Sequence, residues 1–144
     1  AGDVMMRVYQ AMAEKGYVYH VNEMMVSTFV TITGQESVKE AAKRLLKGET
    51  NHLPVIDAEN RLIGIVTTYD VSKAYANDEQ DMTVSEIMTK NVITIAPDAP
   101  VDFAARTLQQ HNIGALVVID ASRHILGMLN SYDLGDLVGG RGRR

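Results

Sequence analysis

Two aspartates, Asp70 and Asp133, each follow an apolar run and begin a stretch with helical character. A carboxylate in the first turn of a helix, directly after a buried strand, can accept hydrogen bonds from two neighbouring ribose hydroxyls at once. An isolated aspartate at this position would more simply interact with the helix dipole. The recurrence of the aspartate at two equivalent places favours ligand binding over a role in the helix alone, and it predicts a nucleoside as the ligand.

Thr67 lies three residues before Asp70, where its hydroxyl can either cap the helix or donate to a phosphate or ribose oxygen at the helix N-terminus. The equivalent place before Asp133 holds Asn130, with Ser131 next to it. Both readings of Thr67 stay open on the sequence alone.

The sequence shows no comparable pattern for catalysis or for metal binding. His52 stands beside the apolar run, whereas His20, His111 and His124 are scattered without the spacing of metal ligands. The sequence contains no nucleophile elbow, no phosphate-cradling glycine loop and no His-Glu zinc pattern. We therefore expect no metal site, no cofactor and no enzyme activity.

The chain repeats itself at an offset of 63 residues without a gap, so that Thr31 matches Thr94, Asp57 matches Asp120 and Asp70 matches Asp133. A duplicated unit of this size decides the architecture before any single residue does. We expect a helical segment over 1–20, a first domain over 21–78, a linker over 79–83, a second domain over 84–138 and a flexible Gly/Arg tail over 139–144.

Each copy predicts the order strand, helix, strand, strand, helix, which is an α/β (α+β) fold. In the first copy, apolar periodicity and the capping-box pair Ser37 and Glu40 predict a helix over 37–48. Two apolar runs predict a buried hairpin, and Thr68 is the expected N-cap of the second helix. The expected bounds are Phe29–Ile32, Leu53–Ile56 and Leu62–Val66 for the strands and 68–77 for the second helix. Copies of about 60 residues should pack sheet to sheet with pseudo-twofold symmetry.

Composition bounds the class of protein. The 144 residues are 46% hydrophobic and 22% charged, as in ordinary globular proteins, and the net charge of −4 gives no general attraction to nucleic acid or anionic lipid. No apolar run approaches the roughly 18 residues of a membrane span, and without cysteine the cytoplasm is the default compartment. The missing initiator methionine suggests a piece of a longer protein. Arg141, Arg143 and Arg144 are read as a flexible tail rather than a nucleic-acid contact.

The duplicated motifs resemble a known family. The first copy carries Asn-His-Leu-Pro-Val-Ile-Asp over Asn51–Asp57 and Gly-Ile-Val-Thr-Thr-Tyr-Asp over Gly64–Asp70. The second carries related motifs over Gly114–Asp120 and Gly127–Asp133. This unit closely resembles a CBS domain, and a tandem pair is called a Bateman module. The motif residues of the first copy are also similar to those of CBS pairs appended to archaeal proteins of sulfur amino-acid biosynthesis.

The resemblance implies a regulatory module that binds AMP, ADP, ATP, S-adenosylmethionine or methylthioadenosine in clefts between its two copies. It also implies a homodimer and an attached or partner enzyme domain. Apolar positions over 71–76 and 134–138 of the second helices favour the same dimer. The resemblance places these residues in the clefts, where simple core packing is the alternative for the apolar ones: Asn51, His52, Ile65, Thr67, Asp70, Met88, Ile93, Ile113, Gly114, Ala115, Asn130 and Asp133.

Charge narrows the ligand. The cations near the expected clefts are His52, Lys90 and Arg106, and polyphosphates are bound by several cations. AMP, S-adenosylmethionine and methylthioadenosine are therefore favoured, and the sequence does not rank them. The alternatives are an ATP/ADP-binding energy sensor, a small nucleotide hydrolase and a nucleic-acid-binding adaptor that uses the tail.

Overall fold

The computed structural model describes residues 18–131, together with residues 6, 7, 10, 13, 14, 16 and 134. Most of the helix expected over 1–20, the aspartate Asp133 and the Gly/Arg tail lie outside the described residues. Within the described part of the chain, no helix is long and apolar enough to cross a membrane.

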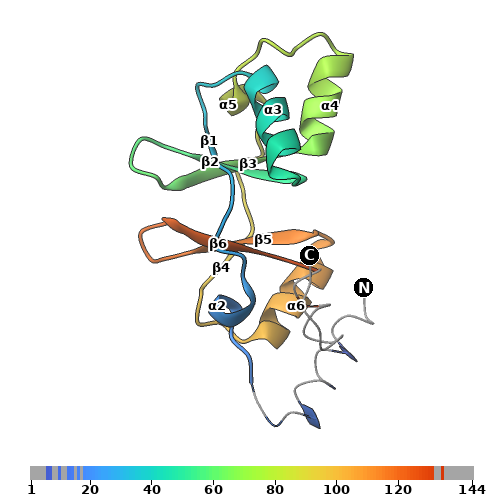
Figure 1. The fold of residues 1–144 in the computed structure, drawn as a ribbon, viewed down its shortest axis with the longest axis vertical. Coiled ribbons are helices and arrows are strands. Elements are labelled where there is room, and N and C mark those ends of the chain that lie inside the picture. The colour runs from blue at the N-terminus through green and yellow to red at the C-terminus, as the bar shows by residue number, and fades with distance from the viewer. Residues whose placement is uncertain are drawn as a thin grey trace. The chain divides into compact units, whose positions relative to one another are not determined.

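The fold is α+β and contains two three-stranded sheets, β1-β2-β3 and β4-β5-β6 (Figure 1). In the first sheet β1 runs parallel to β2, and β2 and β3 form an antiparallel hairpin. The order strand, helix, strand, strand, helix is confirmed in the first repeat. The elements of that repeat are β1 (Ile32–Thr33), α3 (Val38–Gly48), β2 (His52–Ile56), β3 (Leu62–Thr67) and α4 (Thr68–Ala76).

The second repeat gives the same order as far as it is described. Its elements are β4 (Thr94–Ile95), α6 (Val101–His111), β5 (Ala115–Ile119) and β6 (Ile125–Asn130). A short helix precedes each first strand, α2 (Val21–Met24) in one repeat and α5 (Val84–Ile87) in the other.

Three local predictions need correction. The first strand is Ile32–Thr33 and not Phe29–Ile32. The N-cap of α4 is Thr67 and not Thr68, because Thr67 Oγ1 accepts the Asp70 N–H. The capping box of α3 is only half formed: Ser37 Oγ accepts the Glu40 N–H at 3.2 Å, but the Glu40 carboxylate turns to Arg44 instead of the cap.

The two short helices show that the repeats exchange their leading segments. Val21 N of α2 donates to Ala99 O of the second repeat at 2.9 Å, and Val84 N of α5 donates to Glu36 O of the first at 2.8 Å. The two bonds are equivalent under the 63-residue offset. Each leading segment therefore completes the other repeat's core.

The chain accordingly forms two compact units. The α3 unit comprises residues 28–92 and 121–125, and the α6 unit comprises the described parts of 1–27, 93–120 and 126–144. Val84 is fully buried in the core of the α3 unit, and Val21 is fully buried in that of the α6 unit. Packing of the two sheets against each other stays a prediction.

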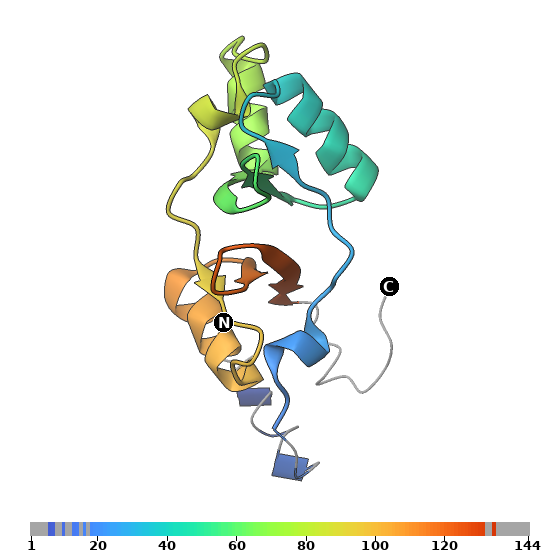
Figure 2. The same cartoon turned by 90° about the vertical axis from the view of Figure 1, so that its left-hand side faces the viewer.

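Helices cover one face of the sheet in the α3 unit, as Figures 1 and 2 show for α3, α4 and α5. Along β3 the burial alternates, with Leu62, Gly64 and Val66 buried and the residues between them half-buried. The helix-facing side of β3 therefore supplies the core. The opposite side presents Ile65 and Thr67, two of the predicted ligand-binding residues.

Candidate functional site

The end of β3 and the start of α4 hold Asp70 in a fixed position. Its Oδ2 accepts the Thr67 N–H at 2.9 Å and the Thr67 hydroxyl at 3.0 Å. Thr67 Oγ1 in turn accepts the Asp70 N–H at 3.3 Å, which completes a capping box. Among the described residues the carboxylate makes no recorded hydrogen bond through Oδ1. Oδ1 is therefore the oxygen that can accept a ligand hydroxyl.

The same contacts decide whether the Thr67 hydroxyl can donate a hydrogen bond to a ligand. The hydroxyl hydrogen of Thr67 is committed to Asp70, so Thr67 cannot donate to a ligand without breaking the capping box. The helix-capping reading of Thr67 is thus what the structure shows. Thr67 would serve a ligand by orienting Asp70.

The start of β2 lies beside this turn. His52 pairs with Thr67 in the antiparallel register, and Asn51 precedes it. Asn51 O accepts the Thr68 N–H at 3.1 Å, and Asn51 Oδ1 accepts the Thr68 hydroxyl at 3.0 Å. His52 is half-buried, and this burial lowers the pKa of its imidazole, which favours the neutral form.

Ile65 and Met88 come together in the α3 unit through the segment that follows α5. Ile65 and Thr89 exchange two backbone hydrogen bonds of 2.9 Å, which lays the segment along β3. The Met88 side chain packs over Gly64, where an added Cβ would lie 2.5 Å from Met88 Sδ and 3.0 Å from Thr89 O. Thr89 was not predicted, although the 63-residue offset relates its pairing with Ile65 to that of Val26 with Met128.

The second set of predicted residues occupies equivalent places in the α6 unit. Ser131 N donates to Gly114 O at 3.3 Å, the counterpart of the Thr68–Asn51 bond. Ala115 begins β5 and Asn130 ends β6. Ile93 and Ile113 pack against the core of this unit, so the apolar slot expected from them together with Ile65 and Met88 stays a prediction.

Two hollows of the α3 unit contain predicted residues. A pocket of about 540 Å³ between α3 and α4 is lined by Asn51 and Thr68 among others. A smaller one of about 290 Å³ contains Asp70 and is rimmed by three further charged side chains. These are Lys73 of α4, Glu79 of the following loop and Glu86 of α5. Asn51 and Asp70 thus line separate hollows within the unit.

Glu86 lines the same hollow as Asp70 and was not among the residues predicted from the sequence. Its Oε1 accepts the Thr83 N–H and the Thr83 hydroxyl, each at 2.9 Å, and the Thr83 N–H bond is the main cause that lowers the pKa of Glu86. The spacing of Thr83 and Glu86 is a capping-box signal that predicts such a helix start. With Asp70 and Glu79, Glu86 gives the hollow three carboxylates for one ammonium group. No group of three or more His, Asp or Glu among the described residues is arranged to hold a metal ion.

Comparisons with known proteins agree on one family. A family model of the CBS domain matches residues 21–77 and 84–139. The CBS domain pair of protein MJ0100, solved in complex with 5′-methylthioadenosine and S-adenosyl-L-methionine, superposes with a TM-score of 0.80 at 37% identity, covering 88% of this chain and 100% of that one. The AMP complex of CBSX2 superposes with a TM-score of 0.75 at 25% identity, covering 85% and 99%.

The curated relatives are longer proteins. An L-aspartate semialdehyde sulfurtransferase of Methanocaldococcus jannaschii is 39% identical over 121 residues, which are 84% of this chain and 23% of the relative. A homoserine O-acetyltransferase of Methanocorpusculum labreanum is 43% identical over 114 residues, or 79% and 23%. The chain therefore spans about a quarter of the length of these relatives.

Proposed function

The chain belongs to the CBS domain family, and from this premise we propose that it is a regulatory module that binds an adenosyl compound. In this proposal the Asp70 carboxylate accepts hydrogen bonds from the ribose hydroxyls, and Thr67 orients Asp70. Asn51 and His52 lie beside the turn between β3 and α4, with Asn51 lining the neighbouring hollow. Asp133 and Asn130 have the corresponding roles in the second repeat. The module itself catalyses no reaction and acts in the cytoplasm.

The observation that carries the proposal is the asymmetric use of the Asp70 carboxylate. A helix first-turn acid needs only one oxygen for the capping box, and Oδ2 serves that purpose with both of its hydrogen bonds. Oδ1 is left at the end of a buried strand, on a side chain that is only partly exposed. A fixed carboxylate oxygen of this kind can accept a ribose hydroxyl without reorganising the turn.

Local charge favours a ligand with little or no phosphate. Asp70 shares its hollow with Glu79 and Glu86, and Lys73 is the one cation in the lining. Three carboxylates repel a polyphosphate, whereas they attract the sulfonium and ammonium groups of S-adenosylmethionine and tolerate neutral methylthioadenosine. AMP, with one phosphate, remains a candidate, and ATP or ADP is disfavoured.

The solved relatives support the same ligand class. The 37% identical CBS pair holds methylthioadenosine and S-adenosylmethionine, and the 25% identical protein holds AMP. The curated relatives carry enzyme names, but this chain matches only about a quarter of each. We therefore assign their activities to the remainder of those proteins and propose that this module regulates an attached or partner enzyme domain.

A thermal-shift panel tests the proposal. The full chain is heated with methylthioadenosine, S-adenosylmethionine, AMP, ATP and adenine-free controls such as ribose 5-phosphate. A ligand at about 100 times its dissociation constant stabilises the folded state by about 2.7 kcal/mol. We expect stabilisation by methylthioadenosine or S-adenosylmethionine and less by ATP. Equal melting temperatures across the panel would refute adenosyl binding, and release of product from AMP or ATP would show a hydrolase.

We also propose that the module is a homodimer, on the evidence of exposed apolar side chains other than those over 71–76. Val71 and Ala74 of α4 are buried within the α3 unit and need no partner. Leu46 of α3 and Tyr69 of α4 instead expose 78% and 72% of their surface. Leu46 also lines the pocket between α3 and α4, and large exposed apolar side chains of this kind favour association. Sedimentation at micromolar concentration gives the mass, and a monomer would contradict the dimer.

The nucleic-acid adaptor is the other class of function. Its only sequence support is the arginine tail, which lies outside the described residues. Removal of residues 139–144 should leave adenosyl binding unchanged. An adaptor would lose binding to a DNA or RNA oligonucleotide on the same truncation.

A further inference from the structure

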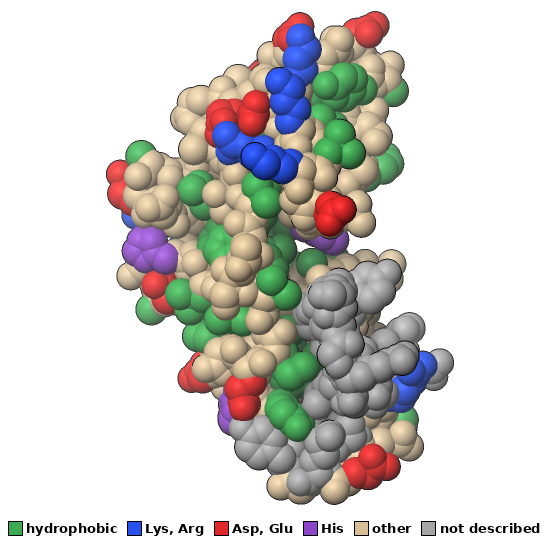
Figure 3. Space-filling model, viewed as in Figure 1, with side chains coloured by type: hydrophobic (Ala, Val, Ile, Leu, Met, Phe, Trp, Pro, Cys, Tyr) green, Lys and Arg blue, Asp and Glu red, His purple; other side chains and the backbone are tan. Residues whose placement is uncertain are grey.

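A third hollow of the α3 unit has no part in the proposed adenosyl site. It has a volume of about 720 Å³ and lies beside α3, on the segment that leads into β1. We call it the basic hollow, and it is lined by Val30, Thr31, Glu40, Lys43, Arg44 and Lys47, with Gly48 at the end of the helix. Figure 3 shows Lys and Arg side chains gathered in the region of α3.

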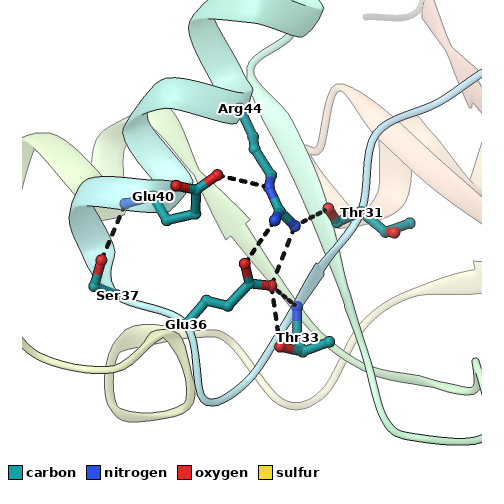
Figure 4. Close-up of polar contacts among 6 residues, drawn as sticks. All are labelled: Thr31, Thr33, Glu36, Ser37, Glu40 and Arg44. Carbon is teal, nitrogen blue, oxygen red and sulfur yellow. Dashed lines mark hydrogen bonds and ion pairs between the residues drawn. The ribbon is translucent and has the colours of Figure 1, made fainter.

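One wall of the basic hollow is a tightly connected polar cluster (Figure 4). Arg44 donates to Glu40 through Nε at 3.0 Å, to Glu36 through Nη2 at 2.6 Å and to Thr31 O through Nη1 at 2.9 Å. Glu36 also accepts the Thr33 N–H at 3.0 Å, and this bond, together with Arg44, lowers the pKa of the Glu36 carboxyl. The guanidinium is thus neutralised by two carboxylates and holds β1 against α3.

The charge of Arg44 is neutralised by carboxylates, whereas the charges of the two lysines of the basic hollow are not. Lys43 and Lys47 are one helical turn apart, both exposed, and neither makes an ion pair within the part of the chain that the structure describes. Lys39, one turn earlier, pairs with Asp81 at 3.0 Å. Two free ammonium groups therefore border a hollow whose lining also includes the apolar Val30.

The second repeat shows that the fold itself does not require these lysines. The positions equivalent to Lys43 and Lys47 are Arg106 and Gln110, and Arg106 is paired with Asp102 at 3.2 Å. Glu36, Glu40 and Arg44 are replaced by Ala99, Phe103 and Thr107. The basic hollow is a feature of one repeat only, in a chain whose net charge is −4.

From this combination we propose that the basic hollow is a docking surface for an acidic protein segment. The segment places carboxylates on Lys43 and Lys47, about one helical turn apart, and inserts an apolar side chain over Val30. This inference does not depend on the proposed adenosyl binding.

The donors and charges of the basic hollow favour an acidic peptide over a compact phosphate or a nucleic acid. Lys47 and Gly48 lie at the C-terminal end of α3, where the N–H groups of Glu49 and Thr50 donate back to carbonyl groups of the helix. A compact phosphate therefore lacks, at this end of α3, the free backbone N–H donors that bind phosphate at helix N-termini. Two free lysines are also few for nucleic acid, whose affinity grows with the number of phosphates contacted. Carboxylates spaced along a peptide match the two ammonium groups one to one.

The test uses a fluorescein-labelled 12-residue peptide with two glutamates four residues apart and one leucine between them. Fluorescence anisotropy measures its binding to the full chain, to the variant Lys43→Gln/Lys47→Gln and to the matched control Lys73→Gln/Lys90→Gln. Both variants remove two exposed charges from the same unit. We expect the first to weaken peptide binding about five- to tenfold, which lies within the roughly two- to thirtyfold effect of two surface ion pairs, and the control to change it less than twofold.

Two further peptides define the recognition. Replacement of both glutamates by glutamine, or of the leucine by serine, should each weaken binding to the wild-type chain. Added salt should weaken binding of the two peptides that keep the glutamates and not that of the glutamine peptide. Equal loss in both lysine variants would mean a general charge effect and would overturn the docking surface. So would binding of a 20-base-pair DNA duplex at this surface as tight as that of the peptide, or no binding of the peptide at all.

Discussion

Thr67 and Asp70 exchange three hydrogen bonds at the start of α4: the amide and hydroxyl of Thr67 donate to Asp70 Oδ2, and Thr67 Oγ1 accepts the Asp70 N–H. The two residues are thus one structural element that both begins a helix and fixes a carboxylate. Stability and ligand binding should respond differently when each partner is changed.

Thr67→Val keeps the side-chain shape but removes the cap acceptor and the hydroxyl donor to Asp70. The free energy of unfolding should fall by about 0.5 to 2 kcal/mol, as for loss of an N-cap, and adenosyl affinity should fall because Asp70 is less fixed. Thr67→Ser retains both bonds and serves as the control. Urea unfolding and calorimetry measure the two effects, and a Thr67→Val variant as stable as Thr67→Ser would contradict the capping contact.

Gly64→Ala should disturb the contact between β3 and the segment after α5. The new Cβ would lie 2.5 Å from Met88 Sδ and 3.0 Å from Thr89 O, so the variant should lose about 1 to 3 kcal/mol of unfolding free energy. Met88→Ala added to Gly64→Ala removes the flexible obstacle and should recover part of the loss, because contacting residues are not additive. Strictly additive effects in urea unfolding would show that Met88 does not pack on Gly64.

His52 predicts a pH dependence of stability. Burial lowers the pKa of its imidazole below the ordinary value of 6.5, so the unfolded chain takes up a proton on His52 at a higher pH than the folded chain does. Stability from this group is complete above about pH 6.5 and falls as the pH drops below it. Glu36 and Glu86 also have lowered pKa values and act in a more acidic window, below about 4.5. His52→Gln should flatten urea midpoints between pH 7 and 5.5, and an unchanged slope there would contradict the burial of His52.

The two ligand sites should be unequal. Asn51 precedes β2 and His52 begins it, whereas the small residues Gly114 and Ala115 occupy the equivalent places before and at the start of β5. A side-chain hydrogen bond is worth about 0.5 to 1.5 kcal/mol, so one or two more at the first site give a several-fold to about hundredfold higher affinity. Titration calorimetry with methylthioadenosine and with S-adenosylmethionine should resolve two affinities. A single affinity for both sites with both ligands would refute the difference.

The sequence was sufficient for the repeat and for the elements inside it. The 63-residue offset and the apolar periodicity of each copy predicted α3, the hairpin β2-β3 and α4 to within a residue or two. These elements are specified by local patterns and their caps.

The exchange of leading segments could not be read in the same way. Val21 and Val84 are at equivalent offsets, so the pattern of each copy is identical whether a segment packs on its own repeat or on the other. Only backbone hydrogen bonds such as Val84 N to Glu36 O distinguish the two arrangements. The choice between Thr67 and Thr68 as N-cap was likewise open, because two adjacent threonines satisfy the same preference.

The central claim, that Asp70 binds the ligand, is tested most directly by titration calorimetry of methylthioadenosine with Asp70→Asn. The amide oxygen of asparagine can still accept the Thr67 donors, so the helix cap and the fold should be retained, while the oxygen left for the ligand is replaced by an amide donor. Exposed Asp98→Asn removes the same charge elsewhere and is the control. Loss of a hydrogen bond to a charged group, about 1.5 to 3 kcal/mol, predicts roughly ten- to hundredfold weaker binding at the tighter site in Asp70→Asn and no change in Asp98→Asn. Unchanged affinity in a folded Asp70→Asn variant would contradict the claim.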